Sequence, residues 1–129
     1  MGKTVRELSP EELLAYHPFR AIEAFRKDRA VAERRDRAWE VARTAADLLR
    51  IEYGATRVVV FGSLAQKPLF TPWSDIDLAV WGIKPEQYLD AAGAVMDMGL
   101  DSGLKIDLVQ PEKCSKDFQT DIETDGIEI

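Results

Sequence analysis

The sequence predicts one domain of the α/β (α+β) class with an N-terminal helical extension, and three observations lead to this. The length of 129 residues suits a single domain with a core of its own. Apolar residues recur at helical spacing within the first 53 residues. Further along the chain, short segments typical of strands are interspersed with helical segments, in the order strand, strand, helix, strand, helix. We therefore expect a helical extension over residues 1–53 and a compact core over residues 54–129.

Two helices are expected in the extension. The Ser9–Pro10 pair, followed by acidic residues, is typical of a helix start. Pro18 predicts an interruption, and a second helix is expected from about residue 28 to 52. The charged run 34–37 in this second helix is interpreted as a solvated face, with a partner-binding surface as the alternative.

Three strands are expected in the core. Residues 57–61 form an unbroken apolar and β-branched run, which is typical of a strand buried on both faces. Residues 75–81 alternate between polar and apolar side chains, and residues 105–109 form the third strand. Helices over residues 86–98 and from residue 111 to about 126 complete the expected order.

The composition excludes several classes of protein. With 46% hydrophobic and 31% charged residues the chain is typical of a globular domain, and no apolar run reaches the ~18 residues of a membrane span. The first residues lack the apolar stretch of a signal peptide, so we expect a cytoplasmic protein without a membrane partner. The single cysteine and single histidine exclude an internal disulfide and a zinc site rich in these ligands. The second half is acidic, which disfavours direct DNA binding and suits a divalent cation.

Three aspartates carry the strongest functional signal. Asp75 and Asp77 are two residues apart on an expected strand, so their side chains share one face, about 6–7 Å apart. Such like charges resist ionising together unless a cation lies between them, and Mg²⁺ prefers carboxylate oxygens together with substrate phosphates. Asp107 faces away from its apolar neighbours in the third strand. If that strand lies beside the second, the three carboxylates converge and can hold two metal ions on one triphosphate.

The turn after the first strand is a candidate phosphate site. Gly62 allows a tight turn and a close approach of the backbone to a ligand. If a helix begins at Ser63, its free N–H groups and the serine hydroxyl can contact phosphate. Residues 64–74 are then expected to form a loop or short helix.

In this order and spacing, the residues resemble the minimal nucleotidyltransferase (MNT) domain of the polymerase-β-like nucleotidyltransferase superfamily over about residues 55–129. The family pattern is Gly-Ser, then Asp-x-Asp on the next strand, then a later Asp, and it often has a serine before the first Asp. The resemblance implies a mixed β-sheet flanked by helices, two Mg²⁺ ions, and transfer of AMP from ATP to a hydroxyl. It implies metal binding and catalysis by Asp75, Asp77 and Asp107, with Asp107 helping to deprotonate the acceptor. It implies nucleotide binding by Gly62, Ser63 and Ser74.

One segment departs from the family pattern. The family often continues as Gly-Ser-x-Ala-Arg-Gly, whereas Gln66, Lys67 and Pro68 follow Ala65 here. The arginine and the second glycine are missing, which bears on triphosphate binding more than on the fold. Lys67 is the residue expected to supply the basic contact with the nucleotide from a shifted position.

The resemblance also implies a partner. Small MNT proteins are often antitoxins paired with HEPN-domain toxins, and some of them transfer AMP to the toxin. Because no second domain is expected to enclose a small acceptor, a hydroxyl of a HEPN-type toxin is the expected acceptor, and the long N-terminal helices are consistent with a homodimer. Three alternatives stay open: a non-catalytic antitoxin that acts by occlusion, an aminoglycoside-type nucleotidyltransferase, and a degenerate domain without turnover. Trp73, next to the aspartates, either stacks on a base or packs within the protein.

Overall fold

The computed structural model describes the backbone of residues 18–129 and the side chains from residue 22 onward. The chain divides into two compact units, one ending at Glu33 and the other running from Arg34 to Ile129. The second unit holds the sheet and every candidate site residue. The helix start expected at Ser9 and Pro10 lies outside the described residues.

The N-terminal helix is longer than the sequence predicts. Helix α2 runs without a break from Pro18 to Tyr53, a length of 36 residues, whereas the predicted start was near residue 28. Pro18 is its first residue rather than an interruption, because a proline at the first helical position gives up an N–H that would have no intrahelical partner. In its N-terminal unit, Arg29 and Glu33 form an ion pair one turn apart, at 3.2 Å between Nε and Oε1.

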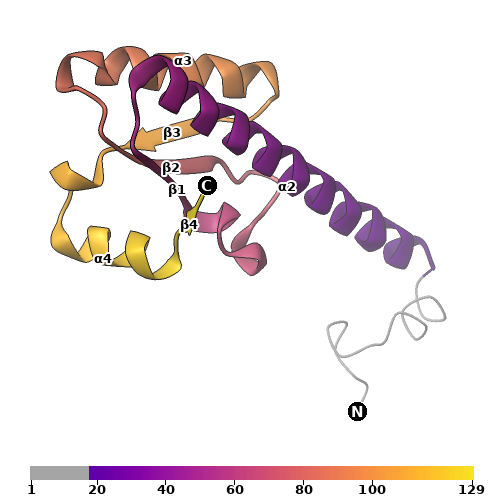
Figure 1. Ribbon diagram of the computed structural model, residues 1–129. Coiled ribbons are helices and arrows are strands. Elements are labelled where there is room, and N and C mark those ends of the chain that lie inside the picture. Colours follow the sequence, from indigo (N-terminus) through magenta and orange to yellow (C-terminus); the bar gives the residue numbers. More distant parts are fainter. Residues whose placement is uncertain (1–17) are drawn as a thin grey trace. The chain divides into compact units, whose positions relative to one another are not determined.

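The sheet has four strands in the order β3-β2-β1-β4 (Figure 1). Strand β2 pairs antiparallel with β1 and parallel with β3, so the sheet is mixed, as predicted. Strand β4 pairs antiparallel with β1 and was not predicted, because two residues are too short to show a periodic pattern. The strands span Arg57–Phe61 (β1), Ile76–Trp81 (β2), Ile106–Val109 (β3) and Ile127–Glu128 (β4).

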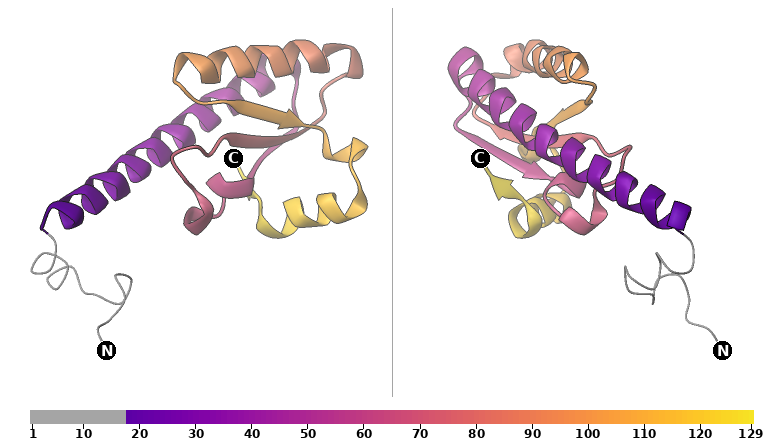
Figure 2. Two further views of the ribbon diagram at one scale, coloured as in Figure 1. Left: turned by 180° about the vertical axis from the view of Figure 1, so that it is seen from behind. Right: turned by 90° about the vertical axis from the view of Figure 1, so that its right-hand side faces the viewer.

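Helices cover both faces of the sheet within the second unit. The C-terminal part of α2 and helix α3, Tyr88–Asp101, lie on one face, and α4, Lys116–Asp125, lies on the other (Figures 1 and 2). The strand residues toward α2 and α3 are buried and apolar: Val58, Val60, Ile76, Leu78, Val80, Ile106 and Leu108. Toward α4, the sheet residues Val59 and Ala79 form a smaller core with Ile122. Because both faces are covered, β1 reads as a continuous apolar run.

The last helix begins later than predicted. Pro111 opens a 3₁₀ turn, η5 (Pro111–Lys113), and the α-helix begins only at Lys116. Ser115 sets this start, because its side-chain oxygen accepts a hydrogen bond from the N–H of Phe118 at 3.2 Å. Helix α3 is likewise shifted by two to three residues from its predicted range, behind the turn η4 (Pro85–Gln87). Within the part of the chain that the structure describes, no helix is both long and apolar enough to cross a membrane.

Candidate functional site

Two of the predicted aspartates lie side by side in the sheet. Strands β2 and β3 pair in parallel with Asp77 opposite Asp107, so both side chains project from the same face. This is the face that α4 covers, and Asp107 remains 42% exposed there. The third strand therefore lies beside the second, as the convergence of the carboxylates requires.

The third carboxylate, Asp75, lies one residue before β2, and its charge reaches Asp77. The pKa of Asp77 is raised above its ordinary value, first because the side chain is half-buried and then because the charges of Asp107 and Asp75 repel its own. Phe61, which lies opposite Asp77 on β1, packs edge-on against Phe118 with ring centroids 5.5 Å apart. The side chain of Phe61 therefore lies beside that of Asp77 on the same face of the sheet.

The glycine–serine turn lies directly against this carboxylate. Gly62 has a φ of +70°, and a Cβ added to it would lie 2.4 Å from Oδ2 of Asp77. The backbone angle favours glycine here, and a side chain at this position would displace the Asp77 carboxylate. Gly62 and half-buried Ser63 belong to a 3₁₀ turn of three residues, η2 (Gly62–Leu64), rather than to a longer helix. The expected helix N-terminus for phosphate is thus reduced to one turn, which has no helix dipole of consequence.

The loop before Asp75 is held by its own hydroxyl groups. Ser74 Oγ accepts a hydrogen bond from the N–H of Thr71 at 2.8 Å and lies 3.1 Å from Thr71 Oγ1. The Ser74 hydroxyl therefore stabilises the loop, whereas nucleotide binding was predicted for it. Trp73 in the same loop is 85% exposed. This excludes the packing role and leaves the indole free to contact a ligand or partner.

Lys67, the predicted basic contact, forms no ion pair with the aspartates among the described residues, and its contact with the nucleotide stays a prediction. It is exposed at the first position of a second 3₁₀ turn, η3 (Lys67–Leu69), where Pro68 follows it. Among the described residues, the lysine that forms an ion pair with a site carboxylate is Lys105, with Nζ 3.6 Å from Oδ1 of Asp107. Strand alternation could have found Lys105, because it lies two residues before Asp107 and so shares its face.

Two arginines of α2 contribute to the site, although the sequence suggested a solvated face. Arg34 donates hydrogen bonds to the carbonyl of Ser74 and to the carbonyl of Gly103, both at 3.4 Å. Arg35 donates to the carbonyl of Leu64 in the turn η2, at 3.5 Å. Both side chains are half-buried, with their Nε atoms out of contact with solvent. The helix thus contacts the segments that lead into β2 and β3 and the turn that follows β1.

The carboxylate oxygens of this face suit Mg²⁺ chemically, although in the part of the chain that the structure describes they are not gathered around one position. In the described residues, no group of three or more aspartate, glutamate, histidine or cysteine side chains is gathered closely enough to hold a metal ion. Carboxylate oxygens are nevertheless the ligands that Mg²⁺ prefers. The pKa of Asp77 is raised first by burial and then by the charges of Asp107 and Asp75, and a bound cation would offset these charges. Asp75 and Asp77 are the pair that would hold an ion, and Asp107, opposite Asp77 on β3, would complete the site.

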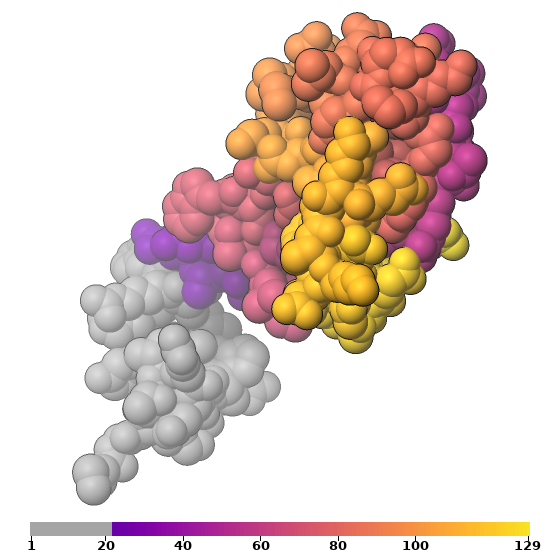
Figure 3. Space-filling view, turned by 90° about the vertical axis from the view of Figure 1, so that its left-hand side faces the viewer, coloured from indigo at the N-terminus to yellow at the C-terminus, as the bar shows by residue number. Residues whose placement is uncertain are grey.

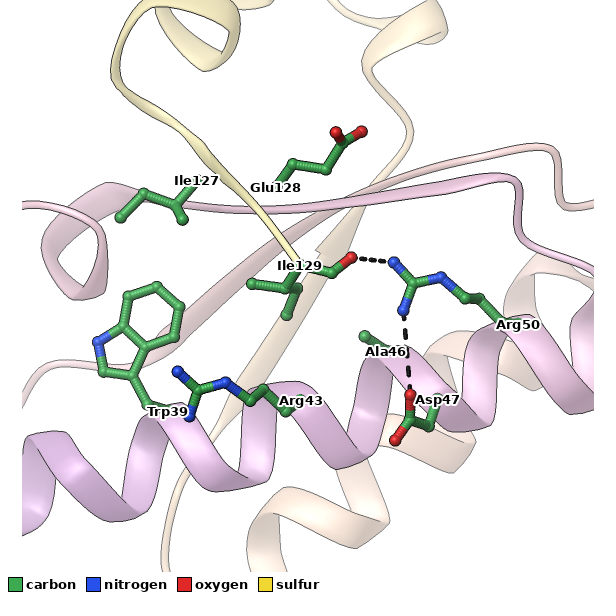
Figure 4. Close-up of a pocket in the computed structure, with 8 residues that line it drawn as sticks. All are labelled: Trp39, Arg43, Ala46, Asp47, Arg50, Ile127, Glu128 and Ile129. Atoms are coloured by element: carbon green, nitrogen blue, oxygen red, sulfur yellow. Dashed lines mark hydrogen bonds and ion pairs between the residues drawn. The ribbon is translucent and has the colours of Figure 1, made fainter.

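A cavity of about 620 Å³ lies elsewhere, between α2 and strand β4 (Figure 4). Trp39 and Arg43 line one side of it, with the arginine carbon Cζ 5.4 Å from the centre of the indole ring. None of its lining residues belongs to the aspartate site. The aspartate site is instead open to solvent at Asp107, which is 42% exposed. Figure 3 shows one side of the molecule, on which the segment after β1 (pink), the β3 region (orange) and α4 (yellow) are exposed together.

Comparisons with known proteins agree with this arrangement. The sequence profile of a family described as "Polymerase beta, Nucleotidyltransferase" matches residues 45–129. A crystal structure of a mutant toxin-antitoxin MntA-HpeT has a TM-score of 0.51 and 24% identity, covering 67% of this chain and 69% of the other. A crystal structure of a toxin-antitoxin with AMP-PNP has a TM-score of 0.52 and 23% identity, covering 64% and 67%. Similarity at this level of identity shows the fold. A comparison with curated proteins finds no significant match.

Proposed function

Because the chain belongs to the polymerase beta nucleotidyltransferase family, we propose that it is a Mg²⁺-dependent enzyme that transfers AMP from ATP to a hydroxyl group. We propose further that the acceptor is a partner toxin of the HEPN type, for which this chain serves as the antitoxin. The observation that carries the proposal is the parallel register of Asp77 with Asp107, with Asp75 beside them and Gly62 against the Asp77 carboxylate. The similar folds of toxin-antitoxin structures, one of them with AMP-PNP, support the nucleotide and the partner.

Each residue of the site has a distinct role in this proposal. Asp75 and Asp77 would hold Mg²⁺, which would supply positive charge to the triphosphate and acidity to the acceptor hydroxyl. Asp107 completes the site and accepts the proton of that hydroxyl. Gly62 allows the Asp77 carboxylate to lie against the backbone, and Ser63 contacts the phosphates.

The transfer itself is an in-line displacement at phosphorus. The acceptor oxygen forms a bond to the α-phosphorus, and the bond from that phosphorus to the oxygen bridging to the β-phosphorus breaks. Pyrophosphate leaves with the electrons of the broken bond, and the proton of the hydroxyl passes to the Asp107 carboxylate. Positioning and charge stabilisation carry most of the catalysis in such reactions.

The proposal is tested by labelling. The protein is incubated with Mg²⁺, ATP labelled at the α-phosphate and the toxin encoded beside its gene. Label is expected in the toxin. The rate of labelling by the Asp75→Ala/Asp77→Ala double variant is expected to be lower by a factor of at least about 100, which is on the order of the effect of removing a catalytic group. Equal labelling by the double variant would exclude catalysis at this site.

A non-catalytic antitoxin is a second candidate, favoured by the position of Lys67. Lys67 forms no ion pair with the aspartates among the described residues, and the arginine and second glycine of the family pattern are missing from this loop. An antitoxin that acts by occlusion would neutralise the toxin equally well with both aspartates replaced. Loss of neutralisation in the double variant, with binding to the toxin intact, would eliminate this candidate.

A further inference from the structure

Lys105 is the cation of the aspartate face. Its ammonium lies 3.6 Å from Oδ1 of Asp107, and its charge lowers the pKa of Asp77 against the repulsion of the other carboxylates. Its carbonyl accepts a hydrogen bond from the N–H of Ile76 at 2.9 Å, which places Lys105 beside Asp75 across the strand pair. Asp77 and Asp107 in the strands, with Asp75 and Lys105 directly before them, thus bring three negative charges and one positive charge close together.

Two other basic residues of the second unit, Arg57 and Lys67, form no ion pair with the aspartates among the described residues. Arg57 forms ion pairs with Glu123 at 2.6 Å and with Glu128 at 2.8 Å, and its guanidinium lies 4.5 Å from the centre of the Trp81 ring. Lys67 is exposed on its own 3₁₀ turn. Lys105, with a side chain that is 54% exposed, is both in contact with the site and free to change its position.

We propose that the Lys105 ammonium pairs with the aspartates in the free protein. When a nucleotide binds with its metal, Lys105 breaks its ion pair with Asp107 and contacts the triphosphate instead. This inference rests on the proposed nucleotidyl transfer, and it assigns to Lys105 the phosphate contact that the sequence placed at Lys67. The occupant of the site is the polyphosphate chain of a nucleoside triphosphate.

Charge explains both positions of the side chain. In the free protein the Lys105 ammonium reduces the repulsion among the three carboxylates, and this repulsion would otherwise destabilise the folded state. Lys105 leaves Asp107 once a divalent cation is held there, because like charges repel. The flexible four-carbon stem of lysine then allows the ammonium to reach the negative phosphates without movement of β3.

The exchange has a signature that a purely structural lysine would lack. As a competitor of the metal, Lys105 weakens the binding of a divalent cation alone. As a phosphate ligand, it strengthens the binding of the triphosphate. Replacing it must therefore move the two affinities in opposite directions.

The test uses the full chain with Mn²⁺ alone and with a non-hydrolysable ATP analogue in saturating Mg²⁺, both followed by isothermal titration calorimetry. Lys105→Gln is expected to bind Mn²⁺ about fivefold more tightly, a factor that corresponds to one exposed ion pair near 4 Å, and the analogue about tenfold more weakly. Lys105→Arg keeps the charge and is expected to restore the affinity for the analogue. Lys84→Gln makes the same change of net charge at an exposed position beyond the other end of β2 and should leave both affinities unchanged.

The outcomes separate the inference from the proposed function. If the wild-type protein binds the analogue while Lys105→Gln changes both affinities in the same direction, or neither, the exchange is wrong and nucleotidyl transfer stands. If the wild-type protein binds neither Mn²⁺ nor the analogue, the proposed function falls and the exchange falls with it. Circular dichroism of each variant establishes that it is folded.

Discussion

The backbone of Gly62 lies against the carboxylate of Asp77, so closely that a Cβ at position 62 would lie 2.4 Å from Oδ2. The position of the Asp77 carboxylate therefore depends on the absence of a side chain in the turn after β1. Gly62 also has a φ of +70°, which side chains rarely adopt.

Replacing Gly62 with alanine should damage the site more than the fold. The positive φ costs about 1–2 kcal/mol, and the new methyl group displaces the Asp77 carboxylate. Gly54→Ala is the matched control, because Gly54 has the same φ of +70° with nothing within 4 Å of the added Cβ. Both variants should lose similar stability in urea unfolding, but only Gly62→Ala should lose binding of Mn²⁺ and nucleotide. Equal binding by the two variants would contradict the proposed role of this contact.

Asp77→Asn should stabilise the metal-free protein while abolishing transfer. Half-burial and the charges of Asp107 and Asp75 raise the pKa of Asp77, and Lys105 offsets only part of this. A raised pKa means that the ionised carboxylate opposes folding. The cost is absent below the unfolded pKa near 3.8 and grows as the pH rises through the folded value. Unfolding in chelator from pH 4 to 8 should therefore show an advantage of the variant that increases above pH 4 and becomes constant once Asp77 is ionised in the folded protein. Asp121→Asn, at an exposed position of α4, should show no such trend.

Arg34→Ala should loosen the segments that lead into β2 and β3. The guanidinium donates to the carbonyls of Ser74 and Gly103 at 3.4 Å, and its loss should lower the free energy of unfolding by about 1 kcal/mol. Arg37→Ala removes an exposed arginine of the same run and should change stability by less than about 0.5 kcal/mol. Chemical denaturation of the two variants measures this difference. Equal stability of the Arg34→Ala and Arg37→Ala variants would mean that Arg34 is a solvated surface residue, as the sequence suggested.

Trp73→Ala should leave stability nearly unchanged, within about 0.5 kcal/mol, because the side chain is 85% exposed. Trp81→Ala should cost at least about 2 kcal/mol, because Trp81 packs against the core below α4. If Trp73 contacts the nucleotide or the acceptor, its fluorescence should be protected from iodide when that ligand is added. If the ligand protects the fluorescence of Trp81→Ala from iodide but does not protect that of Trp73→Phe, the protected indole is that of Trp73.

The fold class and the family could be predicted from the sequence, and both are confirmed. The β-branched run of β1 and the alternation of β2 are local patterns, and they place the strands to within a residue. The start of α2 was wrong because Pro18 fits a first turn as well as a break. The roles of the aspartates stay predictions, although the structure places their carboxylates on one face of two neighbouring strands.

The sequence by itself determined which side chains share a face of each strand, because a strand alternates with a period of two whatever it pairs with. It also placed glycine at the turn where a positive φ is needed. Only the tertiary structure decided that Asp107 lies beside Asp77, that Lys105 rather than Lys67 reaches the carboxylates, and that Arg34 lies against two loops. The pair Asp77 and Asp107 and the contacts of Arg34 join residues that are 30 to 69 positions apart, and they follow from strand register and helix packing, which no local pattern encodes.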